Sequence, residues 1–519
     1  MSLVITILKQ TPIGKVEKRL IEVPGDIDEV YKRVLLEIPN GSEDEMSNIL
    51  KHVLFAFRPL TMIELGIVCG MQPEHQSASS IPPEALHGIR GDVGLCGPLL
   101  KVQSNDTVHL VHYSAKEFLL GSRYFNLQER RFKLNEPTVH FELAKLCLQY
   151  LSFEELARGP LETAFWLSDR VLFQPILQQR PYLEYAGVYW YRYINQSKDR
   201  QLELFDPFRT VLSSKSKRDF FFQVHQYHYR DHLYCGNQKP LHILVRVGLR
   251  IFIDQLLISD SIEIDAEDDF GWTALHWASR QGHEAEVRFL LGSGARLNLV
   301  DKRDAWLALD LAVVYGHEAV VRVIVEEARK RNANAVLNKN ALCLAAENGR
   351  IAIVLLLIEN GADLSSQTGR TALHQAIEGR HTAVVKLLLK KGADIDATDK
   401  LGRTPLFLAT SYEQLETVEL LLKGGAKIRT AVKVTADIGL GGTALDAARR
   451  KGNRQITGLL LGSARFDDEY EAGTLDATIW QASGRVDNRG NDEMQSQATE
   501  STPAIGLEHS NSEGLITCL

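Results

Sequence analysis

The sequence has little that would place it in a membrane or in an oxidising compartment. No apolar run approaches the ~18 residues that a transmembrane helix needs, and the short apolar run at residues 3–8 ends at Lys9. Its six cysteines lie far apart, and none belongs to a CxxC pair. A secreted disulfide framework needs a denser pattern. We therefore expect an intracellular protein, cytoplasmic or nuclear, that contacts no membrane.

Motifs for catalysis and for nucleotide binding are missing as well. No GxSxG nucleophile motif is present. The nearest candidate for a phosphate loop is Gly14-Lys15, but Val16 follows it and Lys9 stands where the first glycine is required. The net charge of −7 is mild and gives no reason to expect nonspecific binding to nucleic acid. We expect no enzyme, no cofactor, no metal, no small-molecule substrate and no direct contact with nucleic acid.

One cluster could ligate zinc by its spacing. It consists of His225, His228, His232 and Cys235. The alternative is a helical bridge whose histidines are solvated, and we favour it because structural zinc sites usually show paired ligands.

The strongest feature present is a repeat that begins at about residue 239. A leucine recurs about every 33 residues, preceded in most units by Thr-Ala or Thr-Pro. Within each period, most units carry a glycine, an apolar run and a Gly-Ala turn in the same order. The recurring leucines are Leu241, Leu275, Leu309, Leu342, Leu373, Leu406 and Leu445.

This pattern closely resembles the ankyrin repeat family over residues 239–465. The resemblance implies stacked helix pairs that bury each other's apolar faces and leave a concave surface for a partner. It places in this groove Phe270, Trp272, Arg280, Gln281, Trp306, Val314, Tyr315, Lys339, Glu347, Asn348, Arg370, Glu378, Arg403, Ser411, Tyr412, Arg450 and Lys451.

Aromatic residues and arginine gather in the first half of the predicted groove, from Phe270 to Tyr315. Trp, Tyr and Arg dominate the energetic centres of protein interfaces. The alternative is that these aromatics pack between repeats or against the preceding helices. For the groove as a whole we expect binding to one or more proteins.

The N-terminal half resembles another known module. Residues 46–128 read as three helices followed by a hairpin, with Thr61-Met62-Ile63-Glu64 as a capping box. Phrases such as Arg58-Pro59-Leu60-Thr61 and Cys96-Gly97-Pro98-Leu99-Leu100 resemble the winged-helix domain that follows the NACHT module in fungal NLR-like (STAND) proteins with ankyrin repeats. Residues 20–38 resemble the segment just downstream of NACHT. Since no phosphate loop is present, the chain resembles the back half of such a receptor without ATP-driven switching.

The predicted fold class is mainly α, with an ankyrin solenoid as its largest part. Residues 466–519 contain 11 acidic and 2 basic residues, which gives this segment a net charge of −9, and we expect it to be disordered. The predicted domains are a helical lead-in at 1–45, a winged-helix domain at 46–128, a helical linker at 129–235, about seven repeats at 236–465 and the acidic tail at 466–519.

The leading hypothesis is a non-enzymatic adaptor or regulator that binds a protein on the concave face. A second hypothesis is a nuclear transcription coregulator of a pathway or gene cluster. The acidic tail and two short basic runs, residues 215–218 and 449–451, permit it. A third is an NLR-like immune or incompatibility component that acts with a separate NACHT protein.

Overall fold

A computed structural model describes most of the chain up to the acidic tail. The described residues are 27–36, 38–39, 41–121, 132–154, 170–229, 237–259, 262–333, 339–365, 370–430 and 442–464. The expectations for the first 26 residues and for the tail lie outside these ranges, as does much of the zinc candidate. No helix within the described ranges is both long and apolar enough to cross a membrane.

The first part of the chain combines short helices with a small sheet. Strand β3 lies at the centre of the antiparallel sheet, in the order β1-β3-β2, and Val108 pairs with Leu60 on one side and Val102 on the other. Thr61 and Glu64 form the expected capping box. The elements are α3 (Ile27–Leu36), α4 (Glu43–Phe55), β1 (Leu60–Thr61), α5 (Met62–Gly70), η2 (Ala78–Ser80), α6 (Pro83–Leu95), η3 (Gly97–Leu99), β2 (Leu100–Val102), β3 (Thr107–Leu110) and α7 (Ser114–Leu120).

A helical segment joins this part to the repeats. Its elements are α8 (Glu136–Ser152), α9 (Arg170–Gln179), α10 (Leu183–Gln196), η6 (Lys198–Leu204), α11 (Phe205–Val211) and α12 (Lys215–Tyr229). Two of its tyrosines bind the N-terminal part, because the Phe57 amide donates to the Tyr185 hydroxyl (3.0 Å) and the Tyr193 hydroxyl donates to the Phe55 carbonyl (3.1 Å).

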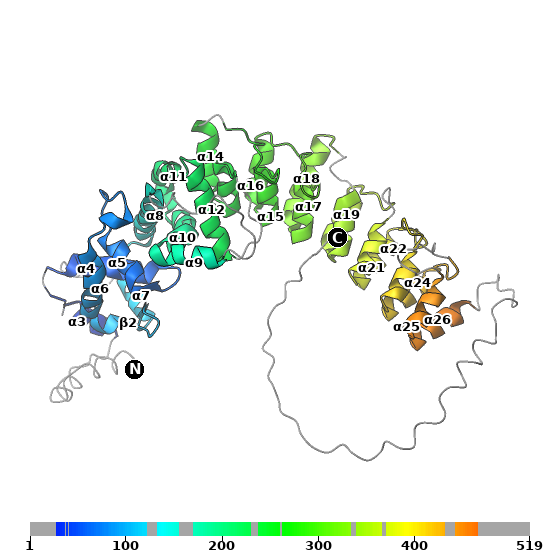
Figure 1. Cartoon of the computed structure of the whole chain (residues 1–519), viewed down its shortest axis with the longest axis horizontal. Helices are drawn as coiled ribbons and strands as arrows, with labels where there is room; N and C mark the ends of the chain where they lie inside the picture. Colours follow the sequence, from blue (N-terminus) through cyan, green and yellow to red (C-terminus); the bar gives the residue numbers. More distant parts are fainter. Residues whose placement is uncertain are drawn as a thin grey trace, which may run out of the picture.

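One contact with the repeats passes through Phe208. Its ring stacks on Trp190 in α10 at a centroid distance of 5.3 Å and meets Phe252 of the first repeat at 5.2 Å. The front half therefore packs against the end of the repeat stack, beside α14 (Figure 1).

Seven helix pairs follow in the described part of residues 237–464. They are α13 (Pro240–Val247) and α14 (Arg250–Ser259), α15 (Ala274–Gln281) and α16 (Glu284–Gly292), α17 (Ala308–Tyr315) and α18 (Glu318–Lys330), α19 (Lys339–Glu347) and α20 (Ile351–Glu359), α21 (Ala372–Glu378) and α22 (Thr382–Lys390), α23 (Pro405–Ser411) and α24 (Leu415–Lys423), and α25 (Ala444–Lys451) and α26 (Arg454–Ala464).

The first helices of successive pairs pack on one another, and the second helices do the same from α16 onward, so the pairs form two layers. Figure 1 shows the pairs along an arc, with α15, α17 and α21 on its inner side. Six of the seven recurring leucines are buried between the layers, and Leu445 of the last repeat is half-buried; Leu275, Leu309 and Leu373 are each 1% exposed or less. This burial is why a single pair is not stable alone and a stack is.

Candidate functional site

Buried histidines connect the first helix of a repeat to the loop that precedes the next repeat. The His374 Nε2–H donates to the Arg403 carbonyl at 3.0 Å, and its Nδ1 lies 2.8 Å from the Thr371 hydroxyl. His276 and His242 make the same contact with the carbonyls of Trp306 and Ala266. Burial lowers the pKa of all three histidines. Neutral imidazoles thus hold the loops at the inner edge of the stack.

The third repeat differs at this position, because Asp310 replaces the histidine. Its Oδ2 accepts the Leu307 amide at 2.9 Å. The side chain is fully buried, and burial raises its carboxyl pKa from 3.8 to about 6. No equivalent bond to the following loop is present among the described residues.

Two of the described loops between repeats are each folded around an aspartate that sequence reasoning missed. Asp268 Oδ1 accepts the amides of Phe270 and Trp272, both at 2.9 Å. Asp399 does the same for Leu401 and Arg403. The signal was present in the sequence, since an Asp stands three residues before Gly271 and again before Gly402. These carboxylates set where the loop side chains point.

The structure corrects the predicted position of Trp272. This side chain is only 4% exposed, so it does not line the surface of the groove. Its indole Nε1–H donates to Asp301 Oδ2 at 3.1 Å, and its ring meets Trp277 edge-on at 4.7 Å. The indole faces inward because the next loop supplies a carboxylate acceptor there.

Arg280 and Tyr315 lie together near the ends of the inner helices α15 and α17. The Arg280 Nε–H donates to the Tyr315 hydroxyl at 3.1 Å. The guanidinium carbon lies 5.0 Å from the Tyr315 ring centre and 5.9 Å from the Trp277 ring centre. Tyr315 is 43% exposed, and its ring stacks on His317. Two neighbouring repeats therefore present a pre-ordered arginine between aromatic rings.

Other predicted residues of this half surround Arg280 and Tyr315. Phe270, Gln281, Trp306 and Val314 are half-buried at the ends of the loops and inner helices. The Arg303 guanidinium lies 4.4 Å from the Phe270 ring centre. Each aromatic therefore has part of its surface packed and part available.

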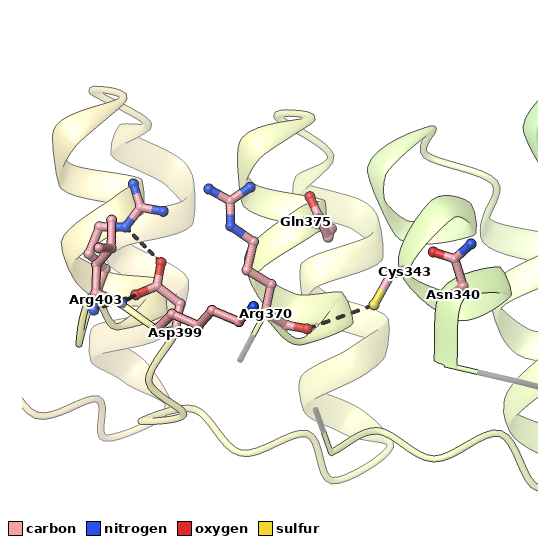
Figure 2. A pocket seen from close by; sticks show the side chains of 8 residues that line it. Asn340, Cys343, Arg370, Gln375, Asp399 and Arg403 are labelled. Carbon is pink, nitrogen blue, oxygen red and sulfur yellow. Dashed lines mark hydrogen bonds and ion pairs between the residues drawn. The ribbon is translucent and has the colours of Figure 1, made fainter. Parts of the chain in front are cut away.

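Predicted residues of the second half form a charged network. Arg370 Nη1 lies 2.8 Å from Glu378 Oε2, and Arg403 Nη2 lies 3.9 Å from Glu378 Oε1. Arg403 Nε also bonds Asp399 Oδ2 at 2.7 Å, and this interaction is drawn in Figure 2. Burial raises the pKa of Glu378 although the two arginines oppose that shift. The charges largely balance one another.

This network borders a hollow of about 500 Å³, also lined by Asn340, Cys343 and Gln375. Figure 2 shows Cys343 directed at the Arg370 carbonyl, with Sγ 3.9 Å from the oxygen. With opposed charges and amides around it, the hollow can accept a polar side chain of a partner.

The remaining predicted residues differ in how exposed their side chains are. Tyr412 is 36% exposed at the end of α23. Glu347 and Asn348 are half-buried, and the Asn348 amide is bound to its own helix through the Leu344 carbonyl. The structure does not describe the Lys339 side chain. No group of three metal-ligating side chains is found in the described ranges, where His228 Nδ1 lies 2.9 Å from Glu184 Oε1.

A protein-family model agrees with the architecture of the repeats. The ankyrin repeat model matches this chain in three overlapping copies, at residues 241–335, 311–399 and 342–432. The crystal structure of the Bcl-3 ankyrin repeat domain is 26% identical and covers 44% of this chain and 99% of that chain, with a TM-score of 0.37.

Two fungal proteins are among the curated relatives. Azaphilone pigments biosynthesis cluster protein L from Monascus ruber is 24% identical over 193 residues, 36% of this chain and 38% of that protein. Vegetative incompatibility protein HET-E-1 from Podospora anserina is 35% identical over 114 residues, 21% of this chain and 8% of that protein. The matches span well under half of either relative. The family model and the stacked helix pairs together establish that residues 241–432 are ankyrin repeats, a module through which proteins contact other proteins.

Proposed function

We propose that this chain is a non-enzymatic adaptor or regulator that binds a partner protein on the concave face of its repeats. The observation that carries the proposal is the Arg280 guanidinium held between Trp277 and Tyr315. Arginine and aromatic side chains that are already ordered lose little entropy on binding. A partially exposed cluster of this kind fits the energetic centre of an interface.

The position of the front half leaves this centre accessible. Helices α3–α12 lie at one end of the arc, and the inner helices α15 and α17 extend beyond them (Figure 1). Phe270 and Trp306 flank the centre with half-buried rings. A partner segment that crosses α15 and α17 would cover these rings and the Tyr315 hydroxyl together.

The test is a double substitution, Arg280→Ala with Tyr315→Ala, in the full chain. Partners are first identified by affinity purification and mass spectrometry, and their binding is then measured by calorimetry. We expect at least about a 30-fold loss of affinity, since each residue at the centre of an interface contributes about 1–2 kcal/mol. Arg322→Ala with Tyr113→Ala is the matched control, because both side chains are exposed away from the groove. Undiminished binding by the folded double variant would reject the concave site.

We further propose that residues 46–121 are a winged-helix module of the NLR-like type. The element order α4-β1-α5-α6-β2-β3, with β3 central in the sheet, supports this proposal. The likeness to a vegetative incompatibility protein favours a role in incompatibility, which we propose this chain performs together with a separate NACHT protein. Co-purification of a NACHT protein with the tagged chain tests the proposal, and ATP binding by this chain alone would contradict it.

A nuclear coregulator of a gene cluster is the second candidate function. The likeness to a protein of a pigment biosynthesis cluster favours it. Microscopy of a tagged chain, together with transcript levels after its deletion, tests this role. Strict exclusion from the nucleus would end it.

A further inference from the structure

The last repeat carries a group of positive charges where α25 ends and α26 begins. Arg449, Arg450, Lys451 and Arg454 are all exposed there, and we call these four residues the basic tip. Residues 442–464 hold one acidic residue, Asp446, whose Oδ2 accepts the Thr443 amide and hydroxyl. The four cations and one anion leave a net charge of +3 on the last described segment.

The start of α26 lacks the negative charge that three of the other outer helices carry, and α14, which begins with Arg250, lacks it as well. The outer helices α16, α18 and α24 have Glu284, Glu318 and Glu416 in their first turns, where a negative charge favours the helix dipole. Helix α26 has no acidic residue in its first turn and begins with Arg454. A cation at a helix N-terminus is unfavourable, so helix stability does not explain this arginine.

Few negative charges of the folded part offset the tip. Glu413 of the preceding repeat approaches it through a 3.4 Å bond from Asn453. Within the described residues, Arg449, Lys451 and Arg454 have no ion-pair partner. The basic tip therefore has the charge to bind a ligand with several carboxylates.

A segment of that composition follows immediately in the sequence. Residues 467–471 read Asp-Asp-Glu-Tyr-Glu, which places four carboxylates in five residues. They begin three positions after α26 ends at Ala464. We infer that this acidic stretch returns along α26 and docks on the basic tip of the same chain.

The available chain length allows this return. Helix α26 has 11 residues, so its length is about 16 Å. An extended chain covers about 3.3 Å per residue, so about five residues after Ala464 reach back to the tip. Glu469 and Glu471 lie five and seven residues after Ala464. Because the two partners are tethered, the effective concentration is in the millimolar range and weak exposed ion pairs suffice.

The docked stretch would lie near Glu413, which accepts a bond from Asn453 and directly follows Tyr412 at the C-terminal end of the predicted groove. This consequence rests on the proposed partner-binding function, because the tail would compete with a partner at that end. The docking itself does not require a partner, so it is tested on the chain alone.

The test is zero-length carbodiimide crosslinking of the full chain, which joins the Lys451 amine to a carboxylate in direct contact. We expect crosslinked peptides between Lys451 and residues 467–471 at an ionic strength of about 0.01 M, and their loss at about 1 M, because the screening length falls from about 30 Å to about 3 Å. A mixture of light and heavy-nitrogen-labelled chains separates crosslinks within one chain from crosslinks between two chains.

Two variants test the electrostatic origin of the contact. Arg449→Glu with Arg454→Glu keeps Lys451 and should lower the crosslink yield by about tenfold, since each exposed pair contributes a factor of about two to five. Lys386→Glu with Lys390→Glu, on exposed positions of α22, is the matched control and should leave the yield unchanged.

A third variant removes the reactive carboxylates by changing Asp467, Asp468, Glu469 and Glu471 to the corresponding amides. If the inference holds, Lys451 of this variant forms no crosslinks with the later acidic residues of the tail. A yield that is unaffected by reversal at the tip, or crosslinks that form only between chains, would overturn the inference. Partner affinity, measured with the Arg280 and Tyr315 variants, reports separately on the concave site.

Discussion

The indole Nε1–H of Trp272 donates a hydrogen bond to Asp301 Oδ2, 29 residues further along the chain, at 3.1 Å. This bond joins the loop before α15 to the loop before α17, and both side chains are buried. Trp272 is therefore part of the packing between repeats, although its position in the sequence places it beside the groove.

The first prediction follows from that burial. Trp272→Ala should lower the free energy of unfolding by about 3–5 kcal/mol, because it removes a buried aromatic ring and leaves the Asp301 carboxylate without its donor. Urea denaturation followed by circular dichroism measures the loss. Trp306→Ala is the control and should cost less, since this ring is half-buried. Similar small losses for both variants would contradict the assignment.

The second prediction concerns pH and Asp310. Burial raises the pKa of this carboxyl from 3.8 to about 6, so the folded state binds a proton more tightly than the unfolded state. The contribution of Asp310 to stability should therefore fall as the pH rises from about 4 through about 6, by about 3 kcal/mol at most. The Leu307 amide and Asn340 oppose this rise in pKa, and the nearby Asp301 carboxylate adds to it.

Asp310→Asn should remove this dependence. The variant should match the wild type below pH 4 and exceed its free energy of unfolding above pH 7, because an amide has no charge to bury. Chemical denaturation at a series of pH values measures the difference. A difference that stays constant over this range would show that Asp310 does not titrate in the folded state.

The third prediction concerns His374, whose contribution to stability should change with pH in the opposite direction to that of Asp310. Burial lowers the pKa of His374 below its usual 6.5, so the unfolded state binds the proton more tightly. The stabilisation that His374 provides should be complete above that pH and decline as the pH falls below it. His374→Gln should therefore cost about 1–2 kcal/mol at pH 8, where the bond to the Arg403 carbonyl is lost, and less at pH 5. An equal cost at both pH values would contradict a neutral buried imidazole.

The fourth prediction uses two glycines of the second repeat. Gly282 and Gly294 both have positive φ, at 75° and 97°, which strains any other residue. An added Cβ at Gly282 would lie within 2.5–2.8 Å of the His317 ring, whereas nothing lies within 4 Å at Gly294. Gly294→Ala should cost about 1 kcal/mol from strain alone. Gly282→Ala should cost clearly more and lower the melting temperature further; equal shifts would contradict the close approach of His317.

The repeat architecture was predictable because its signals are local and recur. Leucines such as Leu275 and Leu373, with capping residues such as Thr371 and turn glycines such as Gly282, each favour the same conformation within a few residues of sequence. The capping box of Thr61 and Glu64 was predictable for the same reason. These patterns established helix pairs and the residues that bury against one another.

The loop aspartates and the pairing of groove residues were harder to predict. Asp268 and Asp399 act through backbone amides of their own loops, so their spacing before a glycine was a usable signal that was missed. The approach of Glu378 to both Arg370 and Arg403 gave no such signal, since it depends on how two repeats rotate against each other.

The sequence by itself determined the stack of helix pairs, since periodic leucines and turn residues act over a few positions and need no knowledge of distant neighbours. Only the tertiary structure decided which of the predicted aromatic residues are exposed. Trp272 turns inward because Asp301 accepts its N–H, and Tyr315 remains exposed beside Arg280, 35 residues away in sequence. The physical reason is that side-chain direction in the groove depends on hydrogen-bond partners in the next repeat, which come into reach only when the repeats stack.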